Sequence, residues 1–170
     1  MKIKIEEYNP KWQDQFNEES HKLISILSGF KPTIEHIGST SIKGLGAKPI
    51  IDILIGLPNF EEATEAVELI KTMQYQYVQE FESSMPNRRF FYKMEGTEKS
   101  HHIHMVQLES DFWKRHIAFR DNLRVNKKDF QDYYDLKLEL SKLEWKDGNE
   151  YAAAKNTFIR AIEEKLPTSK

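Results

Sequence analysis

A turn of small residues and a single carboxylate lie close together in the first third of the sequence. The turn is Gly38–Ser41, and Asp52 follows it inside the apolar run Ile50–Leu57. A glycine lets backbone amides approach an anion closely, and serine hydroxyls add hydrogen-bond donors. Such a turn beside a carboxylate can hold a phosphate chain together with a cation. The residues that we expect to bind this ligand are Gly38, Ser39, Ser41 and Lys48.

Asp52 is the residue that we expect to carry the chemistry, because it is isolated among apolar neighbours. Side chains alternate along a strand, so Asp52 shares one face of its strand with Ile50 and Leu54. Burying an unpaired carboxylate costs on the order of several kcal/mol, so Asp52 requires a cation, a metal ion or several hydrogen bonds. The alternative is that Asp52 pairs with Lys48 or caps a loop.

Two histidines could add ligands to that carboxylate. His102 and His104 are two residues apart in an expected strand, so both imidazoles lie on the same face. On a strand next to that of Asp52, they would complete a divalent-metal site of two imidazoles and one carboxylate. Imidazole ligands suit manganese or zinc better than magnesium, which prefers oxygen. The alternatives are that both histidines are partly buried hydrogen-bonding residues or that they contact phosphate as imidazolium ions.

Basic residues in the last third of the chain are further candidates for phosphate contact. Arg120 and Arg124 follow His116 at successive spacings of four, which places three basic groups on one face of a helix. Arginine binds phosphate through two parallel hydrogen bonds. Lys155, on a later helix that could pack against the sheet, could reach the same ligand. The alternatives are a solvated helix face, neutralisation of Arg124 by Asp121 or Asp111, and, for Lys155, an ordinary surface lysine.

Composition excludes several classes of protein. No cysteine occurs among the 170 residues, which excludes disulfide scaffolds, thiol nucleophiles and thiolate metal sites. The net charge is −2 and the pI is about 6.3, so no basic excess favours nucleic acid. The N-terminal residues lack an apolar leader segment, and no run approaches the ~20 apolar residues of a membrane span. We therefore expect a cytoplasmic protein with a small-molecule partner, and nothing in the sequence indicates its oligomeric state.

The periodicity of apolar residues predicts a single α+β domain over residues 1–170. Strands are expected at 2–6, 33–37, 50–57, 75–80, 88–94 and 101–108. Helices are expected at 10–27, 60–73, 111–124, 126–146 and 149–166, with Asn9-Pro10 and Asn59 starting the first two. The order of these elements favours a mixed sheet packed by helices, with a helical C-terminal part from about residue 110.

The run from His36 to Ile53 resembles the signature of the GrpB family, an uncharacterised bacterial group assigned by resemblance to the nucleotidyltransferase superfamily. Supporting blocks, which extend the resemblance over most of the chain, are His102–His104, His116–Arg124 and Tyr151–Lys155. The resemblance implies a nucleotidyltransferase-like fold. It also implies that Gly38 and Ser39 grip the phosphates of a nucleotide and that Asp52 is the first metal ligand.

The same resemblance leaves one position unmatched. The superfamily pattern has two carboxylates two residues apart on the strand, and Leu54 stands where the second would be. Without that carboxylate, a pair of metal ions cannot be clamped in the usual way. Two functions therefore stay open. One is an enzyme that transfers a nucleotidyl group with a divalent metal (magnesium, manganese or zinc) at Asp52. The other is a module that binds a nucleotide or phosphometabolite without catalysis.

Overall fold

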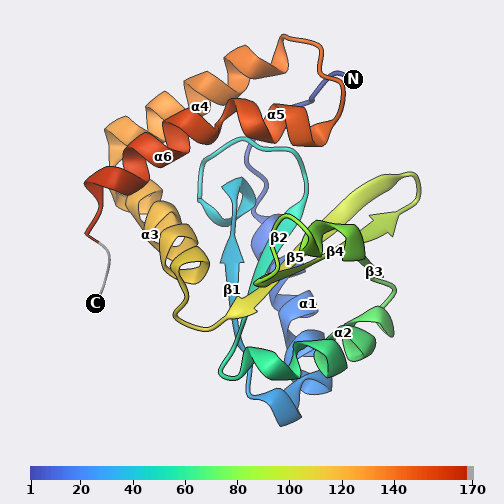
Figure 1. The fold of residues 1–170 in the computed structure, drawn as a ribbon. Helices are drawn as coiled ribbons and strands as arrows, with labels where there is room; N and C mark the ends of the chain where they lie inside the picture. Colours follow the sequence, from blue (N-terminus) through green and yellow to red (C-terminus); the bar gives the residue numbers. More distant parts are fainter. Residues whose placement is uncertain (168–170) are drawn as a thin grey trace.

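The computed structural model of the chain describes residues 1–167 and contains a five-stranded mixed sheet. The strands are β1 (Thr33–Ile37), β2 (Ile51–Leu57), β3 (Gln76–Tyr77), β4 (Arg88–Glu95) and β5 (Glu98–Gln107). Their order across the sheet is β1-β2-β5-β4-β3 (Figure 1). Strands β2 and β5 are parallel, and the other neighbouring pairs are antiparallel. The sheet and the helices that follow it confirm the predicted α+β class.

Helices cover the sheet and form a separate layer at one end of it (Figure 1). They are α1 (Lys11–Ile26), α2 (Ala63–Lys71), α3 (Asp111–Val125), α4 (Lys127–Ser141), α5 (Gly148–Ala154) and α6 (Asn156–Lys165). Ser110 and Asn126 cap α3 and α4, because their side chains accept hydrogen bonds from backbone amides of the first turns. Helices α3 to α6 form the helical C-terminal part that was predicted from about residue 110. Residues 168–170 of the predicted domain lie outside the described residues.

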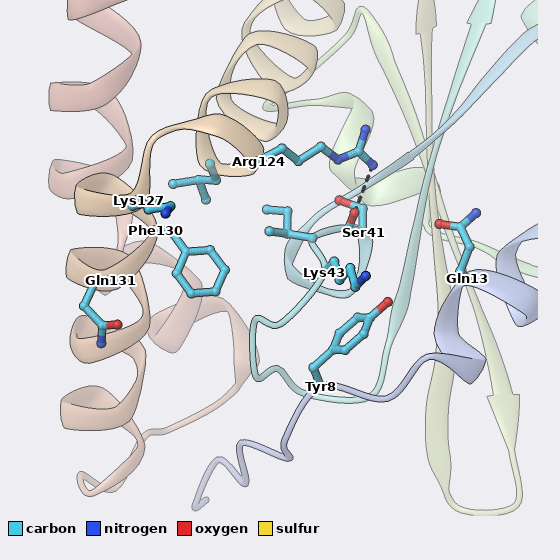
Figure 2. A pocket seen from close by; sticks show the side chains of 10 residues that line it. Tyr8, Gln13, Ser41, Lys43, Arg124, Lys127, Phe130 and Gln131 are labelled. Atoms are coloured by element: carbon cyan, nitrogen blue, oxygen red, sulfur yellow. Dashed lines mark hydrogen bonds between the residues drawn. The ribbon is translucent and has the colours of Figure 1, made fainter.

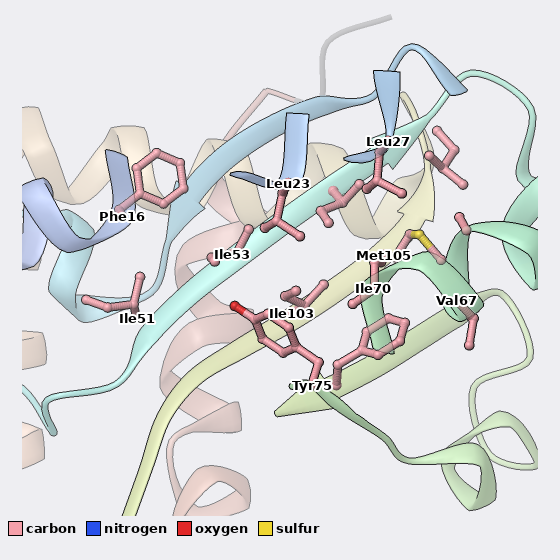
Figure 3. Packing of buried hydrophobic residues seen from close by; sticks show 14 of the residues in the cluster. Phe16, Leu23, Leu27, Ile51, Ile53, Val67, Ile70, Tyr75, Ile103 and Met105 are labelled. Carbon is pink, nitrogen blue, oxygen red and sulfur yellow. The ribbon is translucent and has the colours of Figure 1, made fainter. Parts of the chain in front are cut away.

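Strand β2 is buried on both faces, because different helices pack against each of them. Ile53 points toward α1 and α2, where Leu23 and Ile70 belong to the same apolar cluster (Figure 3). Leu54 points to the opposite face and packs with Trp113 of α3. Burial on both faces explains why the sequence of this strand is almost continuously apolar. Each such side chain stabilises the fold by about 1.5–3 kcal/mol.

The segment 38–50, which links β1 to β2, is held by three different parts of the chain. The N-terminal segment pairs with it through backbone hydrogen bonds. An arginine of α3 and a lysine of α4 each donate a side-chain hydrogen bond to one of its backbone carbonyls. These contacts join Glu6 with Ala47, Arg124 with the Ser41 carbonyl, and Lys137 with the Gly46 carbonyl. The segment is therefore fixed in place although it has almost no regular secondary structure.

Several predicted elements are wrong in their extent. Residues 2–6 form only isolated bridges, because they lie against a loop and the region after α4 rather than a sheet edge. The strand predicted at 75–80 shortens to β3, because residues 79–82 turn into a 3-10 helix. The helix predicted to reach residue 146 ends at Ser141. The helix predicted at 149–166 divides at Lys155, whose amide donates to Ala152, three residues earlier instead of four.

Membrane insertion was not expected from the sequence. Within residues 1–167, no helix combines the length and the apolar character needed to cross a bilayer.

Candidate functional site

Asp52 and the two strand histidines face one another on the sheet. The register of β2 with β5 sets Asp52 opposite His102, and Leu54 opposite His104. Oδ1 of Asp52 lies 3.3 Å from Nδ1 of His102 and 3.9 Å from Nε2 of His104. The expectation that both imidazoles share the sheet face of Asp52 is confirmed. The neighbours of this carboxylate are thus imidazole nitrogens.

Asp52 is ionised at neutral pH. Burial raises its pKa, but the polar interactions with the imidazoles of His102 and His104 outweigh burial and hold the pKa of Asp52 well below its ordinary value. The side chain of Asp52 keeps 28% of its surface exposed, so a ligand can still reach the carboxylate.

Gly38 packs directly against this carboxylate. Its φ is +74°, in the left-handed region that favours glycine, and a Cβ at this position would clash with Oδ2 of Asp52. After this turn, residues 39–41 form one turn of 3-10 helix, in which Ser39 is partly exposed. The hydroxyl of Ser41 donates to the Gly38 carbonyl over 2.5 Å. Both the backbone angle and the close approach therefore require glycine beside Asp52.

Arg88 of β4 determines which nitrogen of His104 carries the proton. Nη1 of Arg88 lies 3.2 Å from Nδ1 of His104, and because arginine only donates, Nδ1 is the acceptor. The proton of the neutral ring therefore lies on Nε2, the nitrogen that faces Asp52. Burial, followed by Arg88 and His102 as smaller causes, lowers the pKa of His104, although Asp52 acts in the opposite direction. His104 is thus a neutral ring that presents an N–H to the carboxylate.

Two more histidines, His116 and His36, belong to the surroundings of this site. Nδ1 of His116 donates to the Phe112 carbonyl over 2.7 Å, and burial, followed by the charge of His104, lowers the pKa of His116 to about 3. Nε2 of His36 lies 3.0 Å from the Thr40 hydroxyl, and burial lowers the pKa of His36 to about 4. At neutral pH both rings therefore contribute hydrogen bonds and packing rather than positive charge.

Leu54 belongs to the core. It is 0% exposed and packs with Ile37, Val106 and Trp113. The position where the superfamily pattern has a second carboxylate is therefore filled by packed apolar side chains. Within residues 1–167, no group of three or more His, Asp or Glu side chains is arranged to hold a metal ion. Metal binding by Asp52, His102 and His104 stays a prediction.

Lys48 and Lys155 both lie near the ring of Tyr151 in α5. Their Nζ atoms are 6.0 Å and 4.5 Å from the ring centroid. Burial, followed by the charge of Lys155, lowers the pKa of Lys48, whereas the charge of Asp52 raises it. The two predicted lysines and the carboxylate therefore belong to one electrostatic neighbourhood.

A third lysine, Lys137 of α4, was missed in the sequence. Its side chain is 2% exposed, and its Nζ donates to the Gly46 carbonyl over 2.6 Å. Burial, followed by the charge of Lys155, lowers the pKa of Lys137 to about 6, while Asp52 opposes this shift. A lysine inside a charged helical segment carries no local signal of burial, so only the tertiary structure reveals it.

The guanidinium of Arg120 is already hydrogen-bonded to other groups of the protein. Its Nη1 donates to Glu35 over 2.7 Å and to the His36 carbonyl over 3.1 Å, and its Nε donates to Asp121 over 2.9 Å. These bonds fasten α3 to β1. A phosphate that used these donors would have to displace a protein acceptor, and its contact with Arg120 stays a prediction.

Ser41 and Arg124 lie beside a separate cavity (Figure 2). Nη2 of Arg124 donates to the Ser41 carbonyl over 2.9 Å, and neither Asp52 nor Lys48 lines this cavity. The predicted site residues therefore divide into groups. Gly38, His102 and His104 lie next to Asp52, and the charge of Asp52 acts on Lys48. Ser39 follows Gly38 in the same turn, and Lys155 lies near Lys48 and Tyr151.

Sequence comparisons identify relatives of this chain. A family model described as GrpB protein matches residues 2–165. The UPF0157 protein YqkA of Bacillus subtilis is 35% identical over 163 residues, which cover 96% of this chain and 47% of YqkA. The glutamate-rich protein GrpB of Alkalihalophilus pseudofirmus is 31% identical over 159 residues, which cover 91% of this chain and 90% of that protein. The chain thus spans about half the length of YqkA.

Structural comparison gives the same relationship. The crystal structure of the conserved protein GrpB from Enterococcus faecalis has a TM-score of 0.84 and 34% identity, covering 95% of this chain and 96% of that one. A crystal structure of the Cid1 poly(U) polymerase has a TM-score of 0.46 and 8% identity, covering 79% of this chain and 45% of that one, and likeness at this level says nothing about activity. Because the family model and these relatives cover nearly its whole length, the chain belongs to the GrpB family.

Proposed function

We propose that this protein binds a nucleoside triphosphate as its complex with a divalent cation, at the Gly38 turn beside Asp52. The observation that carries this proposal is the contact of a left-handed glycine turn with an ionised, partly exposed carboxylate. A turn without a side chain lets a phosphate approach the backbone, and the carboxylate next to it attracts the cation that accompanies the phosphates.

The cation removes an electrostatic conflict at this site. A triphosphate alone would be repelled by the ionised Asp52. Magnesium is usually bound through one or two carboxylates together with substrate phosphates, so Asp52 is a sufficient protein ligand for an ion that arrives with the nucleotide. This mode of binding requires no closed cage of protein ligands, and none is found within residues 1–167.

His102 and His104 would then hold the carboxylate of Asp52 in place. The distances of 3.3 Å and 3.9 Å set them around one oxygen, Oδ1, so the other oxygen faces the Gly38 turn. If the imidazoles bind the ion directly, the site should prefer manganese or zinc to magnesium. The order of affinity among these three ions therefore distinguishes a positioning role from a ligand role.

Lys48 and Lys155 are the cations that we assign to the phosphates in this proposal. The amine of each lies near the ring of Tyr151, and the charge of Asp52 raises the pKa of Lys48. A lysine contacts phosphate as a point charge and can reach it from a flexible stem. Together they would neutralise the phosphate oxygens that the divalent ion leaves unpaired.

Nucleotidyl transfer is a second candidate function, and the ionised Asp52 beside the glycine turn favours it. In that reaction an acceptor oxygen bonds to the α-phosphorus, and the bond to the bridging oxygen breaks to release pyrophosphate. The buried Leu54 favours binding alone, because the second carboxylate of a two-metal clamp is missing. Release of pyrophosphate from ATP that is lost in Asp52→Asn would support transfer.

Calorimetric titration of ATP with magnesium, manganese, zinc or EDTA tests the proposal. Wild-type protein should bind ATP at least about tenfold more tightly with a divalent ion than in EDTA. Asp52→Asn should lose this metal-dependent gain, and Lys48→Gln should weaken binding in every condition. Lys71→Gln, an exposed change on α2, is the matched control and should leave the affinity unchanged. Equal ATP affinity in wild-type and Asp52→Asn with every ion would refute the proposal.

A further inference from the structure

A cavity of about 710 Å³ lies beside residues 41–43 of the segment 38–50. Its walls come from the residues that precede and begin α1, from residues 41–43, and from the corner between α3 and α4 (Figure 2). Ligand pockets in proteins usually have volumes of roughly 300–1,000 Å³, so this cavity can enclose a small organic molecule. Its lining contains neither Asp52 nor either of the histidines that contact it.

The charge in this cavity is positive. Lys43, Arg124 and Lys127 line it, and the lining contains no aspartate or glutamate. Among residues 1–167, no carboxylate lies within ion-pair distance of Lys43 or Lys127. Arg124 is 3.8 Å from Asp121, but the same Asp121 oxygen already accepts a closer bond from Arg120 at 2.9 Å. The cavity therefore attracts an anion.

The remaining walls are apolar and aromatic. Phe130 lies on the α4 side, and Tyr8 faces the cavity from the segment before α1 (Figure 2). Ile42 and Leu123 complete this apolar surface. A flat ring can pack between such side chains, because stacking and apolar burial are both favourable there. An inorganic anion would contact the three basic groups and leave these walls without a partner.

We propose that this cavity binds a small organic phosphate that carries a ring, such as a nucleoside monophosphate. The phosphate would contact Arg124, Lys127 and Lys43, and the ring would pack against Phe130 and Tyr8. This second site is distinct from the triphosphate site at Asp52. It needs no divalent ion, because its own cations outnumber its anions.

Binding of AMP, GMP, UMP and CMP in EDTA, followed by NMR and calorimetry, tests this inference. The absence of divalent ions and the use of Asp52→Asn separate this site from the proposed triphosphate site. We expect at least one of these four mononucleotides to bind equally well to wild-type protein and to Asp52→Asn. The corresponding nucleoside and inorganic phosphate should each bind at least about tenfold more weakly.

Adjacent lysines of α4 provide the matched variants. Lys127→Glu and Lys128→Glu make the same change of net charge in the same first turn, but only Lys127 lines the cavity. Lys127→Glu should weaken mononucleotide binding by at least about tenfold, whereas Lys128→Glu should not. Three results would overturn the inference: no binding of any of the four mononucleotides, equal losses in both lysine variants, or loss of binding in Asp52→Asn.

Discussion

Replacing Lys137 by methionine should change how the stability of the protein depends on pH. In the fold, the pKa of Lys137 is lowered to about 6, whereas an unfolded lysine has the ordinary value of 10.5. At pH values between these two pKa values, Lys137 carries a proton in the unfolded chain but not in the folded chain. Stability therefore rises with pH across this window and is independent of this group below it.

The magnitude follows from proton linkage. One proton contributes about 1.4 kcal/mol of unfolding free energy per pH unit, or about 2.7 kcal/mol between pH 7 and pH 9. Lys137→Met keeps the length of the side chain and removes its titration, so this slope should disappear. The variant also leaves the Gly46 carbonyl without its 2.6 Å donor, which costs about 1–3 kcal/mol at every pH. The slope, rather than the stability at one pH, is therefore the decisive quantity.

Urea unfolding followed by tryptophan fluorescence at pH 7, 8 and 9 measures this slope. Wild-type stability should gain about 2.7 kcal/mol relative to Lys137→Met across that range. Lys142→Met replaces an exposed lysine at the end of the same helix and should leave the wild-type slope unchanged. Parallel curves for wild-type and Lys137→Met would show that Lys137 is charged in the fold, and would refute the reasoning.

Other predictions concern the same region. Gly38→Ala should destabilise the protein by more than Gly96→Ala in urea titrations, because both residues have positive φ but only Gly38 has a neighbour, Asp52, that a Cβ would strike; the left-handed angle alone costs about 1–2 kcal/mol. Leu54→Ala should cost roughly 2–5 kcal/mol of unfolding free energy. Leu54→Asp should cost several kcal/mol more, because it buries an unpaired charge in the core, and comparison of the denaturation midpoints of the two variants measures the difference. His36 has a pKa of about 4 in the fold, below the 6.5 of an unfolded imidazole, so stability should fall as pH drops from 6.5 to 4. His36→Gln should reduce that fall by at most about 1.4 kcal/mol per pH unit in acid titrations, and identical profiles would contradict it.

Sequence periodicity predicted the sheet best where apolar residues are continuous or alternate. The run Ile50–Leu57 predicted the interior strand β2, and the spacing of His102 and His104 predicted their common face. Their meeting with Asp52 depended on one further condition, that β5 pairs directly with β2, and the structure satisfies it. Alternation determined the face on which these side chains lie, and the register of β2 with β5 set Asp52 opposite His102.

Contacts between distant parts of the chain could not be predicted in this way. Arg88 meets His104 only because β4 and β5 pair in a particular register, and Lys137 is buried only because α4 packs over Gly46. Leu54→Asp, which the sequence suggests as a restored metal ligand, is instead a core substitution, since α3 covers that position. In each case the local sequence gives the residue type and the packing of another element decides its role.

The anchoring of the segment 38–50 also determines when the site can form during folding. Its hydrogen bonds to Arg124 and Lys137 join residues that are 83 and 91 positions apart. Contacts over such separations form slowly, because a long chain must be closed before they stabilise anything. During synthesis, residues 38–52 leave the ribosome well before α3 and α4 exist. The Gly38 turn therefore acquires its final geometry late, after the helices that hold it have been made and have docked.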